Sequence, residues 1–569
     1  MKTQAQALAT LLLLLTPYTN SIAAAPDVYV VPAIGSVPIL PNTFPVPGTG
    51  LREIRVTACR GEFEPASFVL RAGATKISNL EISWTNLRGS QGTIPASYID
   101  LRVVAAWYQG GTAGKDIKAD PKPVLVPELL LHDDSMIVPD HQTKTNLVKI
   151  SRNAQSRYVS GEHLAGYGKR RADIDAEAFP LQDLSRLSPV SIEARSNKQF
   201  WITVRVPSLS RTGTYRGTIT GRDEKGTVFT IALTVEVPRF DLRPSRHEYS
   251  IYYRGQLHRG TPVLSSDKKT PRQMAAELKN MREHGITNPT MYQDPNDTEL
   301  LQNALKLYRD AGLTTSRLYY LGLWVGTQTD PAALRAAEVK ALRLRDLAQR
   351  LGLSDIHLYA IDEADGRAVR EQLPVWQHFR RLGFKVFVAG RKTLYDLAGG
   401  ELDVLIAAHS PDKQQAQLWH KSGGRILLYA DPQVGVEDPA LYRRNFGIRL
   451  WQSEYDGAMN YAYQDGFGSI WNDFDSEKYR DHAFTYPTID GVIDTIQWEG
   501  FREAVDDVRY LVTLEDFVSR ATSRNTCGAQ TKTAESLLAA LSADAKVSGF
   551  TFRTSVIEAL NALSPCITE

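Results

Sequence analysis

The chain has 569 residues, of which 43% are hydrophobic, so it is long enough to build more than one globular core. Its 66 basic and 64 acidic residues give a formal net charge of +2, and no long polybasic run occurs. This balance argues against nucleic acid or an acidic membrane surface as a partner.

The first 25 residues have the pattern of a secretory signal peptide. Lys2 supplies a basic start, Leu11 to Leu15 form a short apolar core, and Ser21 to Ala25 offer small residues for cleavage. This apolar segment is too short to cross a bilayer comfortably, and no later segment has the roughly 20 apolar residues of a transmembrane helix. We therefore expect a secreted or periplasmic protein with residues 1–25 removed and no membrane span.

Residues 26–243 have the pattern of an all-β domain. Apolar and polar side chains alternate from Ile202 onward in the segment 200–207, and the segments 215–220 and 228–237 flank a polar turn at 222–226. These two segments predict a hairpin near the end of a β-sandwich. Pro238 and Pro244 mark the linker that follows.

After the linker, Gly285, Gly312, Gly352 and Gly383 each close an amphipathic helix and precede an apolar run. A left-handed helix end costs little only for Gly. The repeat of helix, Gly and strand predicts a (β/α)8 TIM-like barrel over residues 244–517. An open doubly wound sheet is the alternative, although no Gly-rich phosphate loop supports it. The strand candidates are 250–253, 289–292, 318–323, 356–361, 386–389, 404–408, 426–429, 458–463 and 491–496.

Residues 518–569 have a helical pattern, and we expect this C-terminal helical segment to pack on the barrel. Cys527 and Cys566 flank its last helical stretch and can pair in an oxidising compartment, although the sequence leaves their separation open. Cys59 lies in a strand pattern and is expected to be a small core residue. The cysteine spacing matches no zinc site, and we expect no metal and no cofactor.

The dipeptide Asp362-Glu363 follows the buried strand predicted at 356–361. Two adjacent carboxylates at the end of an apolar strand are costly to bury, and catalytic residues of a βα barrel lie where its strands end. The alternative is an N-cap Asp with Glu in the first turn of the next helix. We favour the catalytic interpretation.

The adjacency of the two carboxylates restricts the possible mechanism. Glycosidases that use two facing carboxylates hold them roughly 5 to 9.5 Å apart across the scissile bond, which neighbours on one strand can hardly do. An adjacent pair suits substrate-assisted hydrolysis of a 2-acetamido sugar, in which the acetamido oxygen attacks the anomeric carbon. Asp362 then orients the amide N–H, and Glu363 protonates the leaving oxygen.

The chain resembles glycoside hydrolase family 123 and its uncharacterised bacterial relatives. The resemblance is carried by the predicted sandwich and barrel, by 359–363 (Tyr-Ala-Ile-Asp-Glu), and by 498–510 (Trp-Glu-Gly-Phe-Arg-Glu-Ala-Val-Asp-Asp-Val-Arg-Tyr). It implies a substrate-assisted β-N-acetylgalactosaminidase-like activity, with Asp362 as the stabilising Asp and Glu363 as the general acid/base. It also implies that a Tyr supports the acetamido carbonyl, without saying which one.

Further residues near the predicted strand ends are candidates for binding an oligo- or polysaccharide. In the segment 498–510, Trp498 and Phe501 have helical spacing and the charged residues can form ion pairs, so we expect a scaffold in which only Glu499 faces the cleft. Aromatic rings suit the apolar faces of sugars, and polar groups beside them can bind hydroxyls. The candidates are Arg254, Tyr292, Tyr320, Trp324, His409, Tyr429, Trp471, Asp473 and Glu499.

Two other functions stay open at this point. Glu363 could work with a remote carboxylate, Asp473 or Glu499, in a glycoside hydrolase that acts on another polysaccharide. Alternatively, the barrel could be a non-catalytic glycan-binding envelope protein.

Overall fold

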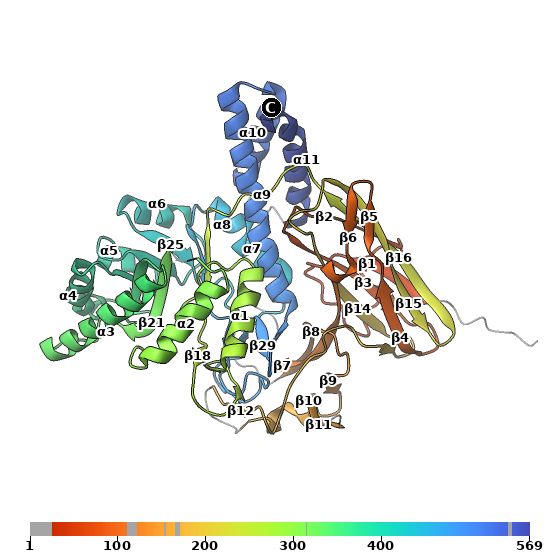
Figure 1. The fold of residues 1–569 in the computed structure, drawn as a ribbon, viewed down its shortest axis with the longest axis horizontal. Coiled ribbons are helices and arrows are strands. Elements are labelled where there is room, and N and C mark those ends of the chain that lie inside the picture. The colour runs from red at the N-terminus through yellow and green to blue at the C-terminus, as the bar shows by residue number, and fades with distance from the viewer. Residues whose placement is uncertain are drawn as a thin grey trace, which may run out of the picture.

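The computed structural model describes residues 26–110, 122–152, 155–165, 171–314, 316–543 and 549–568. The expected signal peptide, residues 1–25, lies outside this range. Figure 1 shows a β-rich part on the right, a parallel sheet surrounded by helices on the left, and a helical part that rises between them. No helix among the described residues is long and apolar enough to cross a membrane.

The β-rich part is built on two sheets whose strands lie between residues 27 and 237. One sheet has the order β1 (Asp27–Val31), β3 (Phe63–Arg71), β14 (Asn197–Arg205), β7 (Ile99–Gly110) and β8 (Pro123–Leu131). The other has the order β13 (Val190–Ile192), β4 (Ile77–Trp84), β15 (Gly213–Asp223), β16 (Gly226–Val237) and β2 (Glu53–Thr57), with β5 (Leu87–Gly89) and β6 (Gly92–Ile94) at its side. β15 and β16 form the predicted hairpin.

Aromatic and aliphatic side chains from the two sheets share one core. Phe68 of β3 stacks on Phe200 of β14 with ring centroids 4.8 Å apart, and lies 5.5 Å from Phe229 of β16 in the other sheet. All three are buried. Burial of each such ring contributes roughly 1.5–3 kcal/mol, so the two sheets form a sandwich around this core. A small sheet of β9 (Ile137–Asp140), β10 (Thr145–Arg152) and β11 (Gln155–Ser160) stands beside them.

The second part contains a curled sheet of seven parallel strands. Its order is β17 (Glu248–Ile251), β26 (Gly457–Asn460), β25 (Arg425–Leu428), β24 (Val404–Ala407), β23 (Lys385–Gly390), β22 (Asp355–Tyr359) and β21 (Arg317–Trp324). Helices α1 (Pro271–Glu283), α2 (Thr298–Asp310), α3 (Pro331–Arg350), α4 (Arg367–Arg381), α5 (Leu394–Ala398), α6 (Lys413–Lys421), α7 (Pro439–Phe446) and α8 (Ile448–Gln452) connect these strands.

An irregular segment, 287–291, joins the two edges of this sheet. Thr290 N donates to Ile251 O on the β17 side at 3.0 Å, and Met291 N donates to Tyr319 O on the β21 side at 2.9 Å. The predicted eight-stranded barrel is therefore confirmed in part, because seven strands form the sheet and this segment bridges its edges. Gly285, Gly312, Gly352 and Gly383 have φ between +74° and +87°, the left-handed helix ends that the sequence predicts.

One predicted barrel strand is wrong. Residues 491–496 contribute β30 (Val492–Asp494), which pairs with β29 (Thr485–Pro487) in a short antiparallel hairpin. Ile493 and Tyr486 of this hairpin pack in the core of the sandwich, not in the barrel. The prediction that residues 491–496 contain a strand is correct, but the strand pairs with β29 and not with a strand of the parallel sheet.

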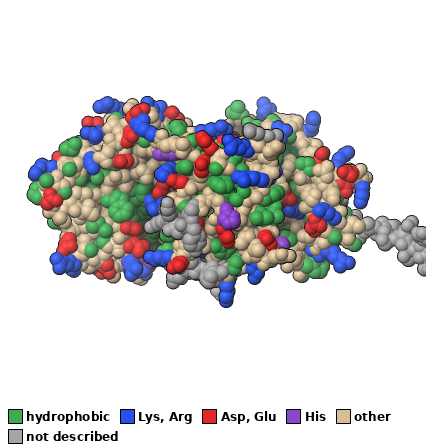
Figure 2. All heavy atoms as spheres, turned by 90° about the horizontal axis from the view of Figure 1, so that it is seen from below, with side chains coloured by type: hydrophobic (Ala, Val, Ile, Leu, Met, Phe, Trp, Pro, Cys, Tyr) green, Lys and Arg blue, Asp and Glu red, His purple; other side chains and the backbone are tan. Residues whose placement is uncertain are grey.

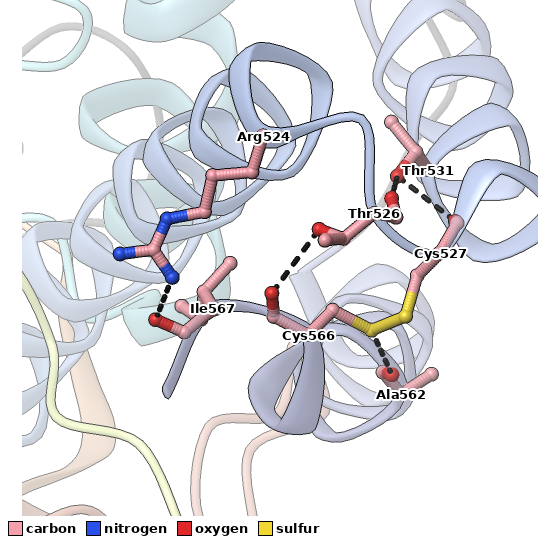
Figure 3. Close-up of a disulfide and its surroundings, with 7 residues drawn as sticks. All are labelled: Arg524, Thr526, Cys527, Thr531, Ala562, Cys566 and Ile567. Carbon is pink, nitrogen blue, oxygen red and sulfur yellow. Dashed lines mark hydrogen bonds between the residues drawn. A yellow bond between two sulfur atoms is a disulfide. The ribbon is translucent and has the colours of Figure 1, made fainter. Parts of the chain in front are cut away.

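The C-terminal part is helical, as predicted, and is closed by a disulfide. Helix α9 (Ile496–Arg524) runs through the expected boundary at residue 517, and α10 (Gly528–Ala543) and α11 (Gly549–Thr568) pack against it. Cys527 and Cys566 form a disulfide, and Cα atoms 6.0 Å apart suit that bond (Figure 3). Cys59 is buried and unpaired, as expected of a core residue.

Candidate active site

A cavity of about 910 Å³ opens where the strands of the barrel end. Its wall is formed by residues that end or follow β17, β21, β22, β25 and β26, and by the segment 464–483, which folds back through β27 (Gln464–Asp465) and β28 (His482–Ala483). Active sites of TIM-barrel proteins lie at this end of the barrel. Six of the predicted site residues line it: Arg254, Tyr292, Trp324, Asp362, Glu363 and Tyr429.

Asp362 and Glu363 leave β22 together and are both exposed on the cavity wall. Their backbone is held by the next strand, since Glu363 N donates to Ala389 O at 3.1 Å. Glu363 has a φ of +47°, an uncommon conformation for a residue with a side chain. The alternative of a helix N-cap is wrong here, because α4 begins at Arg367 and is capped at Gly366.

Two tyrosines hold Asp362 in place. Tyr359 Oη donates to Asp362 Oδ1 at 2.6 Å, and the hydroxyls of Tyr252 and Tyr359 lie 3.1 Å apart. Burial raises the pKa of Asp362, and the hydrogen bond from Tyr359 lowers it. One carboxylate oxygen is thus fixed by protein, and we expect the other to be available to a ligand.

The pKa of Glu363 is raised above the ordinary value of a glutamate. Burial raises the pKa of its carboxyl, the neighbouring charge of Asp362 raises it further, and the charge of Arg391 lowers it. A carboxyl group of this kind keeps its proton at higher pH, which suits a general acid.

Aromatic rings line the remainder of the cavity near the carboxylates. Trp324 is 40% exposed and meets Tyr359 edge to face at 5.3 Å. Tyr252 packs against Tyr429 at 5.7 Å and against Tyr461 at 5.2 Å. Trp324 is thus the exposed large ring beside a packed aromatic cluster, and it stays the candidate platform for an apolar ligand face.

Arg171 and Arg254 add a charged cluster to the lining. Arg171 binds Asp465 through Nε at 2.6 Å and Nη2 at 3.1 Å, and Arg254 Nε donates to Asp267 at 3.0 Å. The guanidinium of Arg254 also lies 4.7 Å from the centre of the Tyr292 ring. These contacts fix both arginines at the wall.

Two predicted aromatic platforms lie elsewhere. Tyr320 is fully buried and donates to Gln293 O at 2.6 Å, so its ring is part of the barrel core. Trp471 is also buried, donates to Pro487 O at 3.0 Å, and packs against Trp107 of the sandwich. Both predictions of a sugar platform are wrong, because the two rings are buried against neighbouring side chains and have no exposed face for a sugar.

The predicted polar groups outside the cavity have structural partners. Asp473 binds Arg480 Nε and Gly110 N, each at 2.7 Å. His409 Nδ1 faces Ser410 O at 2.9 Å, and its side chain does not line the cavity.

Glu499 is likewise turned away from the cavity. It is buried on α9, where it pairs with Arg502 and lies 3.3 Å from His284. The expectation that it faces the cleft is wrong, whereas the expected scaffold role of its helix is confirmed. One group among the described residues has the spacing of metal ligands: His284, Asp494 and Glu499. Its two carboxylates form ion pairs with arginines instead, Asp494 with Arg102 and Glu499 with Arg502.

Several residues of the site were not predicted. Tyr252 and Tyr359 read as apolar strand residues, although Tyr359 stands three positions before Asp362, which could have drawn attention to it. Arg171 lies far from the barrel strands in sequence and gave no signal, whereas Asp475 stands two positions after the predicted Asp473, which could have drawn attention to it. Asp475 is buried in the lining, with Oδ2 accepting from Ser469 N at 2.7 Å, and burial raises its pKa to about 6.

The carboxylate pair and the exposed tryptophan thus lie at the carboxyl ends of the strands of a curled parallel sheet, the end at which TIM-barrel proteins carry their active sites. No family model and no curated protein sequence matches the chain. A family 123 glycoside hydrolase from Clostridium perfringens, studied for glycolipid glycan hydrolysis, matches in structure. It is 11% identical, and the match covers 95% of this chain and 97% of that chain with a TM-score of 0.58. The chain has the fold of that hydrolase over almost its whole length.

Two other solved structures resemble the chain more weakly. A GH2 β-galacturonidase from Eisenbergiella tayi is 12% identical over 79% of this chain and 90% of that chain, with a TM-score of 0.30. A β-glucuronidase from Ruminococcus gnavus is 10% identical over 73% and 68%, with a TM-score of 0.33. Scores this low do not establish a shared fold.

Proposed function

We propose that the protein is a glycoside hydrolase that cleaves β-linked 2-acetamido sugars by substrate-assisted, retaining catalysis. The observation that carries the proposal is the position of Asp362 and Glu363, adjacent in the chain and both exposed on the wall of one cavity. The fold shared with a family 123 glycoside hydrolase supports it.

Asp362 acts on the acetamido group of the substrate. Because Tyr359 occupies Oδ1, Oδ2 is left to accept the amide N–H and to stabilise the positive charge that develops there. The carbonyl oxygen of the acetamido group then attacks the anomeric carbon, and the bond to the leaving oxygen breaks.

Glu363 moves the proton in both halves of the reaction. It gives its proton to the leaving oxygen in the first half, and takes one from the attacking water in the second half. Net retention follows, since the anomeric carbon is inverted twice.

Tyr429 is the tyrosine that we assign to the acetamido carbonyl. Its hydroxyl accepts from Gln433 Nε2 at 3.4 Å, which leaves its proton for a substrate oxygen. The hydroxyl of Tyr461 donates to Asp465 instead and is already used.

The test is hydrolysis of aryl β-N-acetylgalactosaminide and β-N-acetylglucosaminide by wild type, Asp362→Asn and Glu363→Gln. Loss of a general acid or of a stabilising group costs about 10²–10⁴-fold in rate. We expect losses in this range with the fold intact, and inhibition of the wild type by a thiazoline analogue of the cyclic intermediate. An active enzyme that the thiazoline does not inhibit contradicts substrate assistance. Glycan binding without turnover on a broad polysaccharide panel would favour the non-catalytic alternative.

A second mechanism uses a remote carboxylate. Asp473 and Glu499, the partners first considered, face Arg480 and Arg502 and are excluded. Asp475 lies in the cavity wall and takes their place as the candidate. If Asp475→Asn abolishes activity while Asp362→Asn leaves most of it, this mechanism replaces the substrate-assisted one.

We also propose that the protein works outside the cytoplasm as a secreted or periplasmic enzyme. The leader pattern in residues 1–25 motivates this proposal, and the disulfide between Cys527 and Cys566 supports it. Fractionation of the producing cells, with N-terminal sequencing of the mature chain, would test it. Full-length protein in the cytoplasm would refute it.

A further inference from the structure

A second cavity, of about 950 Å³, lies at the opposite end of the barrel from the candidate active site. The barrel contributes the start of β17, the last turn of α1 and the middle of α9, while the sandwich contributes residues 61–63 and Arg205 at the end of β14. The linker residues Pro244 and Ser245 complete the wall. Its volume is in the range of ligand sites, and the proposed hydrolysis does not use it.

Positive charge dominates the lining of this cavity. Glu283 and Asp506 each have a partner inside it, in Lys279 at 3.9 Å and Arg509 at 2.6 Å. Within the part of the chain that the structure describes, Arg205 and Arg282 have no carboxylate partner. The cationic lining residues are Arg205, Lys279, Arg282, Arg502 and Arg509, and the acidic ones are Glu62, Glu283 and Asp506.

The remaining acidic group adds little negative charge. Glu62 is buried, and this burial raises its pKa to about 8, so its carboxyl is mostly protonated at neutral pH. The surplus of positive charge over the lining is therefore larger than a count of residues implies.

Two arginines converge on one aromatic ring. The guanidinium of Arg205 lies 5.2 Å from the centre of the Phe63 ring, and that of Arg502 lies 5.4 Å from it. Arg502 is buried and is held by Glu499 outside the cavity, whereas Arg205 is exposed. Both guanidiniums add positive charge near this ring, and a bound anion would offset that charge.

We propose that this cavity binds an acidic saccharide, a sugar that carries a carboxylate or a sulfate. Arg205 and Arg282 bind the anionic group, because a guanidinium matches the geometry of such oxyanions. Phe63 adds apolar surface to the wall, and Ser245 and Thr314 lie in the lining, where their hydroxyls can bind sugar hydroxyls. The site joins sandwich and barrel and is independent of hydrolysis at the other cavity.

The experiment measures binding by calorimetry to the full chain carrying Glu363→Gln, which prevents turnover. The probes are sulfated maltohexaose, hexagalacturonate and neutral maltohexaose. Arg205→Gln is the site variant, and Arg216→Gln, at an exposed position of β15, is the matched control. Losing one charge-assisted contact of about 1.4 kcal/mol weakens binding about tenfold. We expect saturable binding of at least one anionic probe, weakened about tenfold by Arg205→Gln and unchanged by Arg216→Gln.

The same titrations locate the ligand and identify its acidic group. Binding of the sulfated probe alone or of the galacturonate alone assigns sulfate or carboxylate, and Trp324→Ala should leave either unchanged. The proposal is overturned if no probe binds saturably, or if neutral maltohexaose binds as well as the anionic probes. It is also overturned if Arg205→Gln and Arg216→Gln weaken binding equally, or if Trp324→Ala abolishes binding. Circular dichroism of each variant confirms that it folds.

Discussion

Glu363 is the residue whose chemistry depends most on its neighbours. The charge of Arg391, an exposed residue after β23, lowers the pKa of Glu363, against the raising effects of burial and of Asp362. In the proposed mechanism kcat/KM falls as pH rises through this pKa, because Glu363 must be protonated to act as the acid. Arg391→Gln should therefore raise the pKa and move the basic limb of the pH profile to higher pH.

The measurement is the pH dependence of kcat/KM at low ionic strength for wild type and Arg391→Gln. Arg88→Gln, at an exposed position of β5, is the matched control and should leave the profile unchanged. Added salt should reduce the difference, because exposed charges are screened. A basic limb that stays in place or moves down would mean that Glu363 is not the acid.

The backbone of Glu363 is the second feature at this scale. Its φ of +47° costs a side-chain-bearing residue roughly 1–2 kcal/mol, and glycine avoids this cost. Glu363→Gly should thus be more stable than Glu363→Ala by about 1 kcal/mol, while both are inactive. Chemical denaturation of the two variants checks this prediction, and equal midpoints would show that the residue leaves the left-handed region.

At the scale of elements, the sequence predicted where helices and strands lie along the chain better than it predicted which strands pair and which elements pack together. All seven strands of the parallel sheet were among the predicted strands. The helix-Gly-strand pattern located three of them, those after Gly312, Gly352 and Gly383, because Gly at a helix end and an apolar strand are local signals. Val492 to Asp494 were recognised as a strand, yet only non-local packing places them in a hairpin on the sandwich. For the same reason Trp471 and Asp473 looked like strand-end groups, although the fold-back segment buries them beside Trp107 and Arg480.

The disulfide between Cys527 and Cys566 ties the ends of α10 and α11 to each other. The two cysteines are 39 residues apart, and closing a loop of this length in the unfolded chain stabilises the folded state by about 3–4 kcal/mol. Cys527→Ser should lower the free energy of unfolding of the C-terminal helices by about this amount. Denaturation with and without reductant checks it, since reductant should destabilise wild type and leave the variant unaffected. An equal response of both would mean that the bond contributes nothing.

At the scale of the whole molecule, buried charges join the three parts. Arg553 of α11 binds Glu503 at 2.7 Å and Asp507 on α9, and reaches Glu64 of β3 at 3.2 Å. Burial raises the pKa of Glu64 and of Glu503. Such a network contributes less to stability than to relative position, because desolvation offsets most of the attraction between the charges. It fixes the sandwich and the helices against the barrel, and so shapes the cavity between them.

Glu62 lies in this junction and makes the joined parts sensitive to pH. Its Oε2 accepts from Cys59 N at 2.6 Å in the sandwich and from Tyr510 Oη of α9 at 2.9 Å. Its pKa is about 8 in the folded protein, against an ordinary value of 4.5. The folded state therefore holds a proton that the unfolded chain releases above about pH 4.5, so this group makes unfolding easier as pH rises from about 4.5 to about 8.

Glu62→Gln removes this proton linkage and keeps the acceptor for Cys59 and Tyr510. We expect the free energy of unfolding of the variant, relative to wild type, to increase with pH between about 4.5 and 8 and to be constant outside this range. Urea denaturation at a series of pH values measures the difference. Glu81→Gln, at an exposed position of β4, is the control that should show no such slope. A difference that stays constant over this range would mean that the pKa of Glu62 is not raised and that its carboxyl is ionised in the folded protein. The positive charge of the adjoining cavity would then be partly cancelled, so this slope also tests the electrostatic basis of acidic-saccharide binding there.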